Sequence, residues 1–262
     1  MKPPRPEDYL EFAIDAAHAA GRLTLGYFQA GVQPDMKPDD TPVTVADRKA
    51  EQLIRGRIER RFPDHRIVGE EFGRKDGDAA APCWWIDPID GTKAFVRGVP
   101  LYGVLLGLEA DGRIVAGAAY FPALDEMVCA AEGTGCFWNG RRCRVSDVDR
   151  LSRAVVSFTN AANFKAARRE TVWRRAVDQA YHTVGWSDAY GHALVATGRL
   201  ELMLDPLMNP HDCGPFPVIL REAGGYFGDW SGTETIHAGE ALSTSRRLLP
   251  DVLRLVAGRD EP

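Results

Sequence analysis

The sequence predicts an α/β protein in two parts, an α+β half over residues 1–145 and a smaller α/β half over residues 146–262. Two observations support this. Two helical patterns come first and are followed by β-rich segments that Asp-Gly or Pro turns separate. Beyond about residue 146 the pattern changes to an alternation of strands and helices. We expect the first half to place its helices on a largely antiparallel sheet.

The first half begins with two segments whose apolar residues recur at three- and four-residue steps. Residues 9–28 are expected to form one helix, and a Pro- and Asp-rich loop over residues 31–42 follows. Residues 44–62 are expected to form the second helix. Thr44 and Asp47 at its start resemble a capping box, with Asp where Glu is usual. A capping role alone would explain Asp47.

Strands are expected next, because β-branched and aromatic residues stand between turn signals. Two of these strands end on a carboxylate, at Glu70 and Asp87. Asn139-Gly140 is typical of a tight hairpin turn. The expected strands are residues 66–70, 83–87, 102–108, 114–120, 127–131, 136–138 and 141–145.

In the second half, short apolar runs alternate with helical patterns. Gly224-Gly225 is a helix-ending signal. The expected strands are residues 154–158, 200–204, 226–228 and 240–243. The expected helices are residues 165–181, 189–197, 212–223 and 245–257.

The composition is that of an ordinary globular protein, with 45% hydrophobic and 26% charged residues. A net charge of −5 argues against a nucleic-acid partner, which favours a basic surface. No apolar run is long enough for a bilayer span, and the first residues lack a signal-peptide core, so we expect a cytoplasmic protein without a membrane partner. Five cysteines without a Cys-x-x-Cys pair do not indicate a zinc site or a disulfide framework.

The segment around Asp87 and Asp90 carries the strongest chemical signal. The two carboxylates follow an apolar strand, Pro88 stiffens the turn between them, and Gly91-Thr92 can begin a helix. Oxygen donors beside free backbone N–H groups suit a phosphate held by divalent cations. Separate surface carboxylates are the alternative interpretation.

Three further acidic residues, Asp47, Glu70 and Asp212, could join this pair. Gathered carboxylates repel one another and a phosphate, so only cations make such a cluster useful. Oxygen ligands without His or Cys favour Mg²⁺ over zinc. Thr92 could then position a water molecule if Asp47 accepted its hydroxyl proton.

These blocks together resemble the inositol monophosphatase family, and their order covers almost the whole chain. The resemblance implies a layered α/β/α/β/α sugar-phosphatase fold, often dimeric, and Mg²⁺-dependent hydrolysis of a phosphate monoester by a directly attacking water. We therefore expect a homodimer acting on a small phosphorylated metabolite. The matching segments are Thr41 to Asp47, Gly69-Glu70-Glu71, Trp85 to Thr92, Asn209 to Asp212 and Glu222 to Gly225.

The resemblance also implies roles for single residues. Glu70, Asp87 and the Ile89 carbonyl would hold one metal ion, while Asp87, Asp90 and Asp212 would hold another. One departure is that His211 replaces the Trp that usually precedes the last of these carboxylates. Since proline is tolerated in a first helical turn, the Pro that follows still allows Asp212 to act from a helix start.

The catalytic residues implied by the resemblance are Asp47, Thr92 and Glu70. Asp47 and Thr92 would form the pair that orients the water. Asp90 and the N–H groups of Gly91 and Thr92 would contact the phosphate.

The substrate is expected to be selected further along the chain, at Asp188 and Asp205. Two carboxylates beside the leaving group favour a cationic substrate over a neutral polyol. Trp186-Ser187-Asp188-Ala189-Tyr190-Gly191 resembles the histidinol-phosphatase branch of the family, which acts in histidine biosynthesis. Histidinol phosphate carries an ammonium group and an imidazole. A simple helix N-cap is the alternative role for Asp188.

Two other functions stay open. The same chemistry could act on inositol 1-phosphate or a related sugar phosphate. The chain could also be a non-catalytic regulator on a phosphatase scaffold, although every metal-binding carboxylate expected from the family is present.

Overall fold

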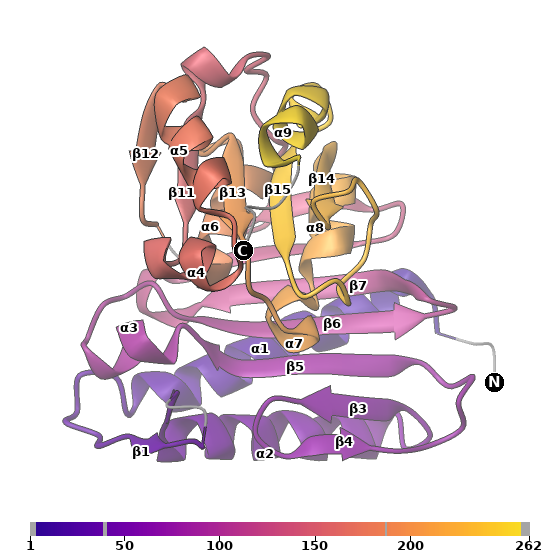
Figure 1. Cartoon of the computed structure of the whole chain (residues 1–262). Helices are drawn as coiled ribbons and strands as arrows, with labels where there is room; N and C mark the ends of the chain where they lie inside the picture. Colours follow the sequence, from indigo (N-terminus) through magenta and orange to yellow (C-terminus); the bar gives the residue numbers. More distant parts are fainter. Residues whose placement is uncertain (1–3, 39–40, 187, 258–262) are drawn as a thin grey trace.

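The computed structural model describes residues 4–38, 41–186 and 188–257, and within them helices and sheets stack in alternating layers (Figure 1). Each sheet packs helices against both of its faces, which confirms the expected α/β/α/β/α arrangement. The helices are α1 (Pro6–Leu25), α2 (Val45–Arg61), α3 (Thr92–Val96), α4 (Ala161–Ala166), α5 (Glu170–Gln179), α6 (Asp188–Ala196), α7 (Pro210–Cys213), α8 (Phe216–Glu222) and α9 (Leu249–Val256).

The larger sheet occupies the first half of the chain and is antiparallel except where β3 runs parallel to β5. Its strand order is β10-β9-β8-β7-β6-β5-β3-β4, so β5 is an interior strand. The strands are β3 (Arg66–Gly69), β4 (Gly73–Lys75), β5 (Cys83–Asp90), β6 (Gly103–Ala110), β7 (Arg113–Phe121), β8 (Glu126–Ala131), β9 (Gly135–Trp138) and β10 (Arg141–Arg142). Before it, β1 (Asp35–Met36) and β2 (Pro42–Val43) form a small hairpin.

Successive side chains of a strand point to opposite faces, and both faces of β5 are buried. Trp84 and Ile86 pack in the cluster under α1 and α2. Trp85 joins a second cluster on the opposite face, together with residues of α6 and α8 such as Val195 and Ile219. The predicted division after residue 145 lies between the sheets, but this second cluster joins residues from both sides of it.

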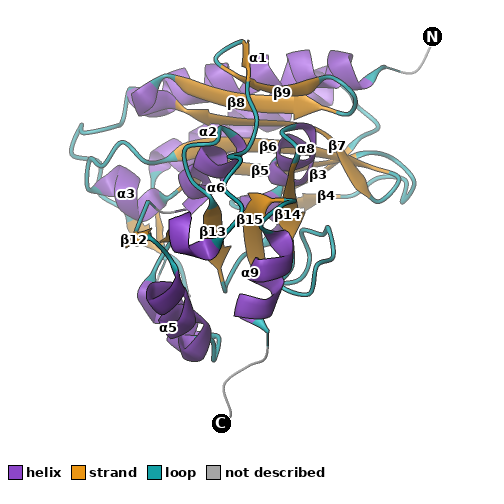
Figure 2. Cartoon of the chain, turned by 90° about the horizontal axis from the view of Figure 1, so that it is seen from above, coloured by secondary structure: helices purple, strands orange, loops and turns teal. Residues whose placement is uncertain are grey.

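The smaller sheet has the order β12-β11-β13-β15-β14. Its far face packs against α5 and α9, which lie away from the larger sheet (Figure 2). The strands are β11 (Val155–Phe158), β12 (His182–Val184), β13 (Leu202–Asp205), β14 (Gly225–Gly228) and β15 (Ala241–Ser245).

Two predicted helices are each divided in the structure. The helix expected over residues 165–181 is replaced by α4 and α5, because Arg168 adopts a left-handed φ of 58° between them. The helix expected over residues 212–223 is replaced by α7 and α8, with Pro215 as the N-cap of α8.

The junction between α7 and α8 lies directly on the larger sheet. A Cβ atom at Gly107 of β6 would overlap the Gly214 carbonyl, and one at Gly117 of β7 would lie 2.7 Å from Pro215 Cα. Glycine at these strand positions therefore permits the close approach of the helical backbone. This contact brings Asp212 over the end of β5.

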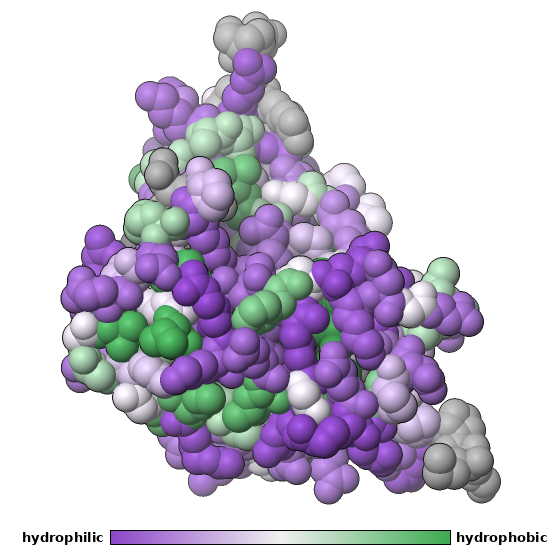
Figure 3. All heavy atoms as spheres, turned by 90° about the horizontal axis from the view of Figure 1, so that it is seen from below, coloured by the Kyte–Doolittle hydropathy of each residue, from purple (hydrophilic) through white to green (hydrophobic). Residues whose placement is uncertain are grey.

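The surface shown in Figure 3 is largely hydrophilic, and its hydrophobic residues form small groups. Within the described residues, no helix has the length and apolar character that crossing a bilayer requires.

Candidate active site

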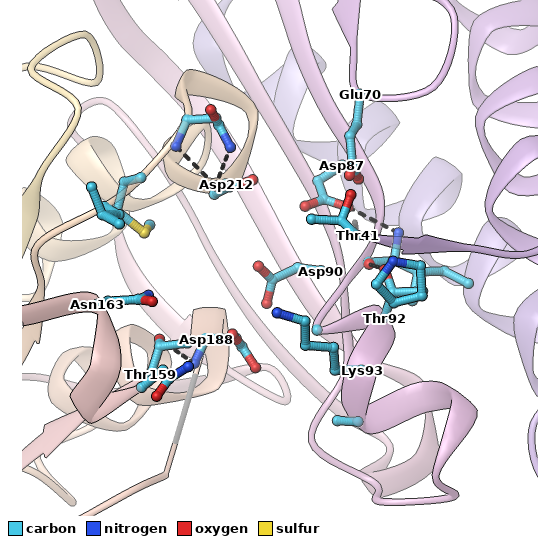
Figure 4. Close-up of a pocket in the computed structure, with 18 of the residues that line it drawn as sticks. Thr41, Glu70, Asp87, Asp90, Thr92, Lys93, Thr159, Asn163, Asp188 and Asp212 are labelled. Carbon is cyan, nitrogen blue, oxygen red and sulfur yellow. Dashed lines mark hydrogen bonds between the residues drawn. The ribbon is translucent and has the colours of Figure 1, made fainter. Parts of the chain in front are cut away.

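Asp87 and Asp90 lie at the carboxyl end of β5. Pairing with β6 shifts register between them, an irregularity that redirects side chains at strand ends. The Ile89 N–H donates to Asp87 Oδ1 at 3.0 Å, which holds the turn. Both side chains point into one pocket (Figure 4), although they are only 2% and 8% exposed.

Asp212 completes a group of three carboxylates. It is held by Asn209, whose backbone N–H and side-chain amide donate to Asp212 Oδ2 at 2.9 and 3.2 Å. One carboxylate oxygen from each of Asp87, Asp90 and Asp212 lies within 4.8 Å of the others. Asp212 stands in the short helix α7, before the helix that it was expected to begin. His211 Nε2 lies 3.1 Å from Asp212 Oδ1, so the residue in place of the usual Trp contacts this carboxylate.

Glu70 approaches the group from β3, the parallel neighbour of β5. Its N–H donates to the Ile86 carbonyl at 3.2 Å. Lys37, from the hairpin before α2, donates to Glu70 Oε1 and to Glu71 Oε1, both at 2.7 Å. Sequence reasoning missed Lys37, whose thirty-three-residue separation from Glu70 leaves no local signal. Lys37 balances part of the negative charge at this edge of the pocket.

Burial and mutual repulsion make the ionised carboxylates unfavourable. Burial raises the pKa of Asp87 well above its usual value, and the charges of Glu70, Asp90 and Asp212 raise it further. Burial likewise raises the pKa of Asp90, with the charges of Asp188 and Asp212 adding to the effect. The pKa of Asp212 is raised mainly by burial. A bound cation would relieve this repulsion.

Asp47 uses its two oxygens differently. Oδ2 accepts from Thr44 N at 2.8 Å and from Thr44 Oγ1 at 2.6 Å, which confirms the predicted capping box. Oδ1 faces Thr92, whose hydroxyl lies 3.4 Å away and also donates to the Ile89 carbonyl at 3.1 Å. Burial raises the pKa of Asp47, although the hydrogen bonds from Thr44 oppose the shift. The cap and the contact with Thr92 therefore coexist in one side chain.

Gly91 makes the turn from β5 into α3 possible. It is the N-cap of α3 and has a left-handed φ of 78°, which glycine adopts without strain. A Cβ atom there would lie 3.2 Å from the Leu101 carbonyl and 3.3 Å from Asp188 Oδ2. The first N–H groups of a helix have no partner within that helix, so the start of α3 presents backbone donors to the pocket.

These groups surround a cavity of about 540 Å³ (Figure 4). Asp47 and Asp205 are the predicted site residues that do not line it. Those that do are Glu70, Asp87, Ile89, Asp90, Gly91, Thr92, Asp188 and Asp212.

The cavity has further polar walls that sequence reasoning missed. Lys93 lines it from α3 and Arg97 from the C-cap of that helix, and the Lys93 ammonium points toward Asp90 (Figure 4). Asn160 and Asn163 line it from the opposite side, at the start of α4. A signal existed for the asparagines, because they follow the carboxyl end of a predicted strand, where functional groups collect.

The two carboxylates expected to meet the substrate lie in different environments. Asp188 lines the cavity from the first turn of α6. Asp205 is 1% exposed at the end of β13, between β11 and β15. Its oxygens accept from the Thr159 backbone N–H at 3.2 Å and contact His192 Nε2 at 3.1 Å. Both oxygens of Asp205 face protein groups and Asp205 does not line the cavity, so a direct contact between Asp205 and the substrate stays a prediction without support from this geometry.

The donor set of the cavity fits Mg²⁺. Asp87, Asp90, Asp212 and Glu70 offer carboxylate oxygens, and Ile89 lines the same wall. Hard oxygen ligands without His or Cys thiolate are those that Mg²⁺ prefers.

Comparisons with known proteins agree with this geometry. The model of the inositol monophosphatase family matches residues 5–259. The chain is 42% identical over 257 residues to a histidinol-phosphatase of Chlorobaculum parvum, covering 96% of this chain and 97% of the relative. It is 34% identical to a histidinol-phosphatase of Mycobacterium tuberculosis, covering 96% and 99%. The solved structure of the extragenic suppressor protein suhB from Bartonella henselae superposes with a TM-score of 0.88 at 28% identity, covering 95% and 98%. The chain belongs to the inositol monophosphatase family.

Proposed function

We propose that this protein is a Mg²⁺-dependent phosphate monoester hydrolase whose substrate is histidinol phosphate. The observation that carries the reaction is the convergence of the buried carboxylates of Asp87 and Asp90 with the half-buried carboxylate of Asp212 within 4.8 Å, beside the Thr92–Asp47 contact. The relatives named histidinol-phosphatases, up to 42% identical, support the choice of substrate.

The metal-binding roles follow from the donor positions. Glu70, Asp87 and the Ile89 carbonyl would hold one Mg²⁺, and Asp87, Asp90 and Asp212 would hold another. When bound, Mg²⁺ supplies Lewis acidity, which lowers the pKa of a water, orients the phosphoryl group and neutralises the leaving alkoxide. Burial and the neighbouring carboxylates raise the pKa of Asp87 and Asp90, so a cation bound among them would stabilise their ionised forms.

Thr92 and Asp47 would handle the proton of the attacking water. The Thr92 hydroxyl would accept a hydrogen bond from the water and pass its own proton to Asp47 Oδ1, giving up its contact with the Ile89 carbonyl. The water oxygen forms a new bond to phosphorus while the bond to the leaving alkoxide breaks. The alkoxide takes up a proton from solvent and Asp47 later returns its proton to solvent, so the products are an alcohol and inorganic phosphate. Oriented proton transfer of this kind typically contributes about 10²–10⁴-fold in rate.

The phosphate would lie at the start of α3. The N–H groups of Gly91 and Thr92 donate to its oxygens, and the Lys93 ammonium adds positive charge from the same helix. Asp90 would act on the phosphate indirectly, as one of the residues that would hold Mg²⁺ beside it.

The neighbouring wall of the cavity, formed by the starts of α4 and α6, would bind the alcohol part of the substrate. Asp188 offers a carboxylate to the ammonium group of histidinol, and Asn163 offers an amide to its imidazole (Figure 4). The amide of Asn163 could equally bind a hydroxyl group of a sugar or polyol, which makes inositol 1-phosphate the second candidate substrate. A non-catalytic role is disfavoured, because the carboxylates required for metal binding converge in the cavity.

Steady-state kinetics with Mg²⁺ on histidinol phosphate and inositol 1-phosphate tests the proposal. We expect the larger kcat/KM for histidinol phosphate. An isosteric Asp188→Asn variant should lower kcat/KM for histidinol phosphate by about tenfold or more, the scale of one charged contact, and lower it less for the neutral inositol ester. A clear preference for inositol 1-phosphate would contradict the proposed substrate.

The homodimer remains a proposal that rests on the resemblance to the family. Light scattering of the purified chain tests it, and a mass of one 28.8 kDa chain would contradict it.

A further inference from the structure

Three polar side chains meet inside the smaller sheet, away from the cavity surface. His192 comes from α6, Asp205 from the end of β13 and Ser243 from β15. Each is at most 1% exposed. Burying a charged group is costly unless hydrogen bonds compensate it, so the contacts of this group decide its role.

Each polar atom of the group has a defined partner. His192 Nδ1 lies 2.7 Å from Ser243 Oγ, and His192 Nε2 lies 3.1 Å from Asp205 Oδ2. A neutral imidazole has one donor and one acceptor, and an ionised carboxylate can only accept. With a neutral His192 and an ionised Asp205, the His192 Nε2–H would donate to Asp205 and the Ser243 hydroxyl would donate to His192 Nδ1. Asp205 is thus fixed in orientation by a side chain on α6.

The second oxygen of Asp205 reaches toward the active site. Its Oδ1 accepts from the Thr159 backbone N–H at 3.2 Å, just beyond β11. The Thr159 hydroxyl in turn accepts from the Asp188 backbone N–H at 2.9 Å (Figure 4). A continuous chain of hydrogen bonds therefore runs from His192 through Asp205 and Thr159 to Asp188.

The series of hydrogen bonds ends at Asp188, the first residue of α6, whose backbone conformation is strained. Asp188 has a left-handed φ of 56°, which side chains other than glycine adopt at a cost. The next residue, Ala189, donates its N–H to Asp90 Oδ2 at 2.8 Å. The first turn of α6 is thus held between Thr159 and Asp90, and the Asp188 carboxylate lies against Gly91 at the phosphate end of the cavity.

We propose that Asp205 and His192 are positioning residues that hold Thr159, and through it Asp188, in the orientation that recognises the substrate. The ligand named here rests on the proposed function. Apolar side chains could fill this part of the core at lower cost than a buried carboxylate. Asp205 instead accepts a hydrogen bond from the backbone of Thr159, a residue that lines the cavity. Its effect on substrate selection is therefore indirect.

The test removes one link without placing a charge in the core. Thr159→Val deletes the hydroxyl that accepts from Asp188 N–H, whereas Thr159→Ser keeps it. We expect Thr159→Val to raise KM for histidinol phosphate about tenfold, the factor that matches one lost hydrogen bond, with kcat changed by less than about threefold. Thr159→Ser should restore most of the lost affinity. In an Asp188→Asn background, Thr159→Val should have little further effect, because the two act as one unit.

Amide hydrogen exchange without substrate separates this proposal from the proposed function. Thr159→Val should accelerate exchange at the start of α6, and Asp205→Asn should do the same if it folds. The control is Thr197→Val, which removes a hydroxyl that donates to Ala193 O at 2.9 Å, at the other end of the same helix. If wild-type enzyme fails to hydrolyse histidinol phosphate, the proposed function is wrong, and exchange still decides the positioning role. The positioning role would be overturned if amide exchange at the start of α6 were equally fast in wild type and Thr159→Val. It would also be overturned if KM for histidinol phosphate rose equally in Thr159→Val and Thr159→Ser.

Discussion

Replacing Gly69 by alanine should destabilise the protein and weaken its affinity for Mg²⁺. A Cβ atom at Gly69 would overlap Glu51 Oε1 and lie 2.8 Å from Oε2. The Glu51 side chain is fully buried, and its two oxygens accept from Glu71 N at 2.7 Å and Phe72 N at 3.2 Å. It also pairs with Arg55 Nε at 2.6 Å. Alanine therefore forces this carboxylate away from the turn that carries Glu70.

The size of the effect follows from those contacts. Each hydrogen bond to a charged group contributes about 1.5–3 kcal/mol, so losing two costs about 3–6 kcal/mol. Partial relaxation of Glu51 lowers this, and we expect a loss of about 3 kcal/mol in the free energy of unfolding, at the lower end for disrupting a buried ion pair. Urea unfolding measures the loss, and the rise in Tm with added Mg²⁺ reports metal affinity.

Gly56→Ala is the matched control within α2. A Cβ atom there has Arg60 Nη1 as its nearest neighbour, at 3.5 Å, so this substitution should stabilise the helix by about 0.5–1 kcal/mol. The role assigned to Glu51 is wrong if the free energy of unfolding of Gly69→Ala lies within about 0.5 kcal/mol of the wild-type value, because that difference is smaller than the loss of one hydrogen bond to a charged group.

Two other predictions concern the carboxylates and the water-orienting pair. Because burial raises the pKa of Asp87, Asp90 and Asp212 above the unfolded values, the metal-free protein should lose stability as pH rises from about 4. The Mg²⁺-induced rise in Tm, measured by calorimetry, should therefore be larger at pH 8 than at pH 6, and equal rises would contradict this linkage. Thr92→Ala should lower kcat by about 10²–10⁴-fold, whereas Thr92→Ser, which keeps the hydroxyl toward Asp47, should stay within about tenfold of wild type. Phosphate-release assays measure both variants, and similar losses in the two would exclude the hydroxyl role.

Local patterns predicted most of the helices and strands, because apolar periodicity reports which face is buried. They failed where the backbone changes direction without a glycine or proline, as at Arg168 between α4 and α5. Gly214-Pro215 did stand in the sequence, but the close approach to Gly107 that accompanies the break depends on tertiary packing.

The carboxylates of the proposed metal site could be singled out from sequence because they stand in dense motifs, at strand ends for Glu70, Asp87 and Asp90 and in a short helix for Asp212. The environment of Asp205 could not be predicted, since an acidic residue ending a strand looks the same whether it faces a cavity or a buried histidine. Its partners Thr159 and His192 lie 46 and 13 residues away. Lys37 was missed for the same reason, because its contact with Glu70 exists only once β1, β2 and β3 have assembled.

The central claim is that the Asp87–Asp90–Asp212 cluster binds Mg²⁺ for phosphate ester hydrolysis. The most direct measurement is phosphate release from histidinol phosphate by wild type and Asp90→Asn, each with Mg²⁺ and with a chelator. We predict that Asp90→Asn lowers kcat by at least about 10²-fold, the scale of lost catalytic charge stabilisation, and that chelation abolishes wild-type turnover. Asp111→Asn, in the exposed turn between β6 and β7, should retain wild-type turnover. Unchanged turnover by Asp90→Asn, or full activity with chelator, would contradict the claim.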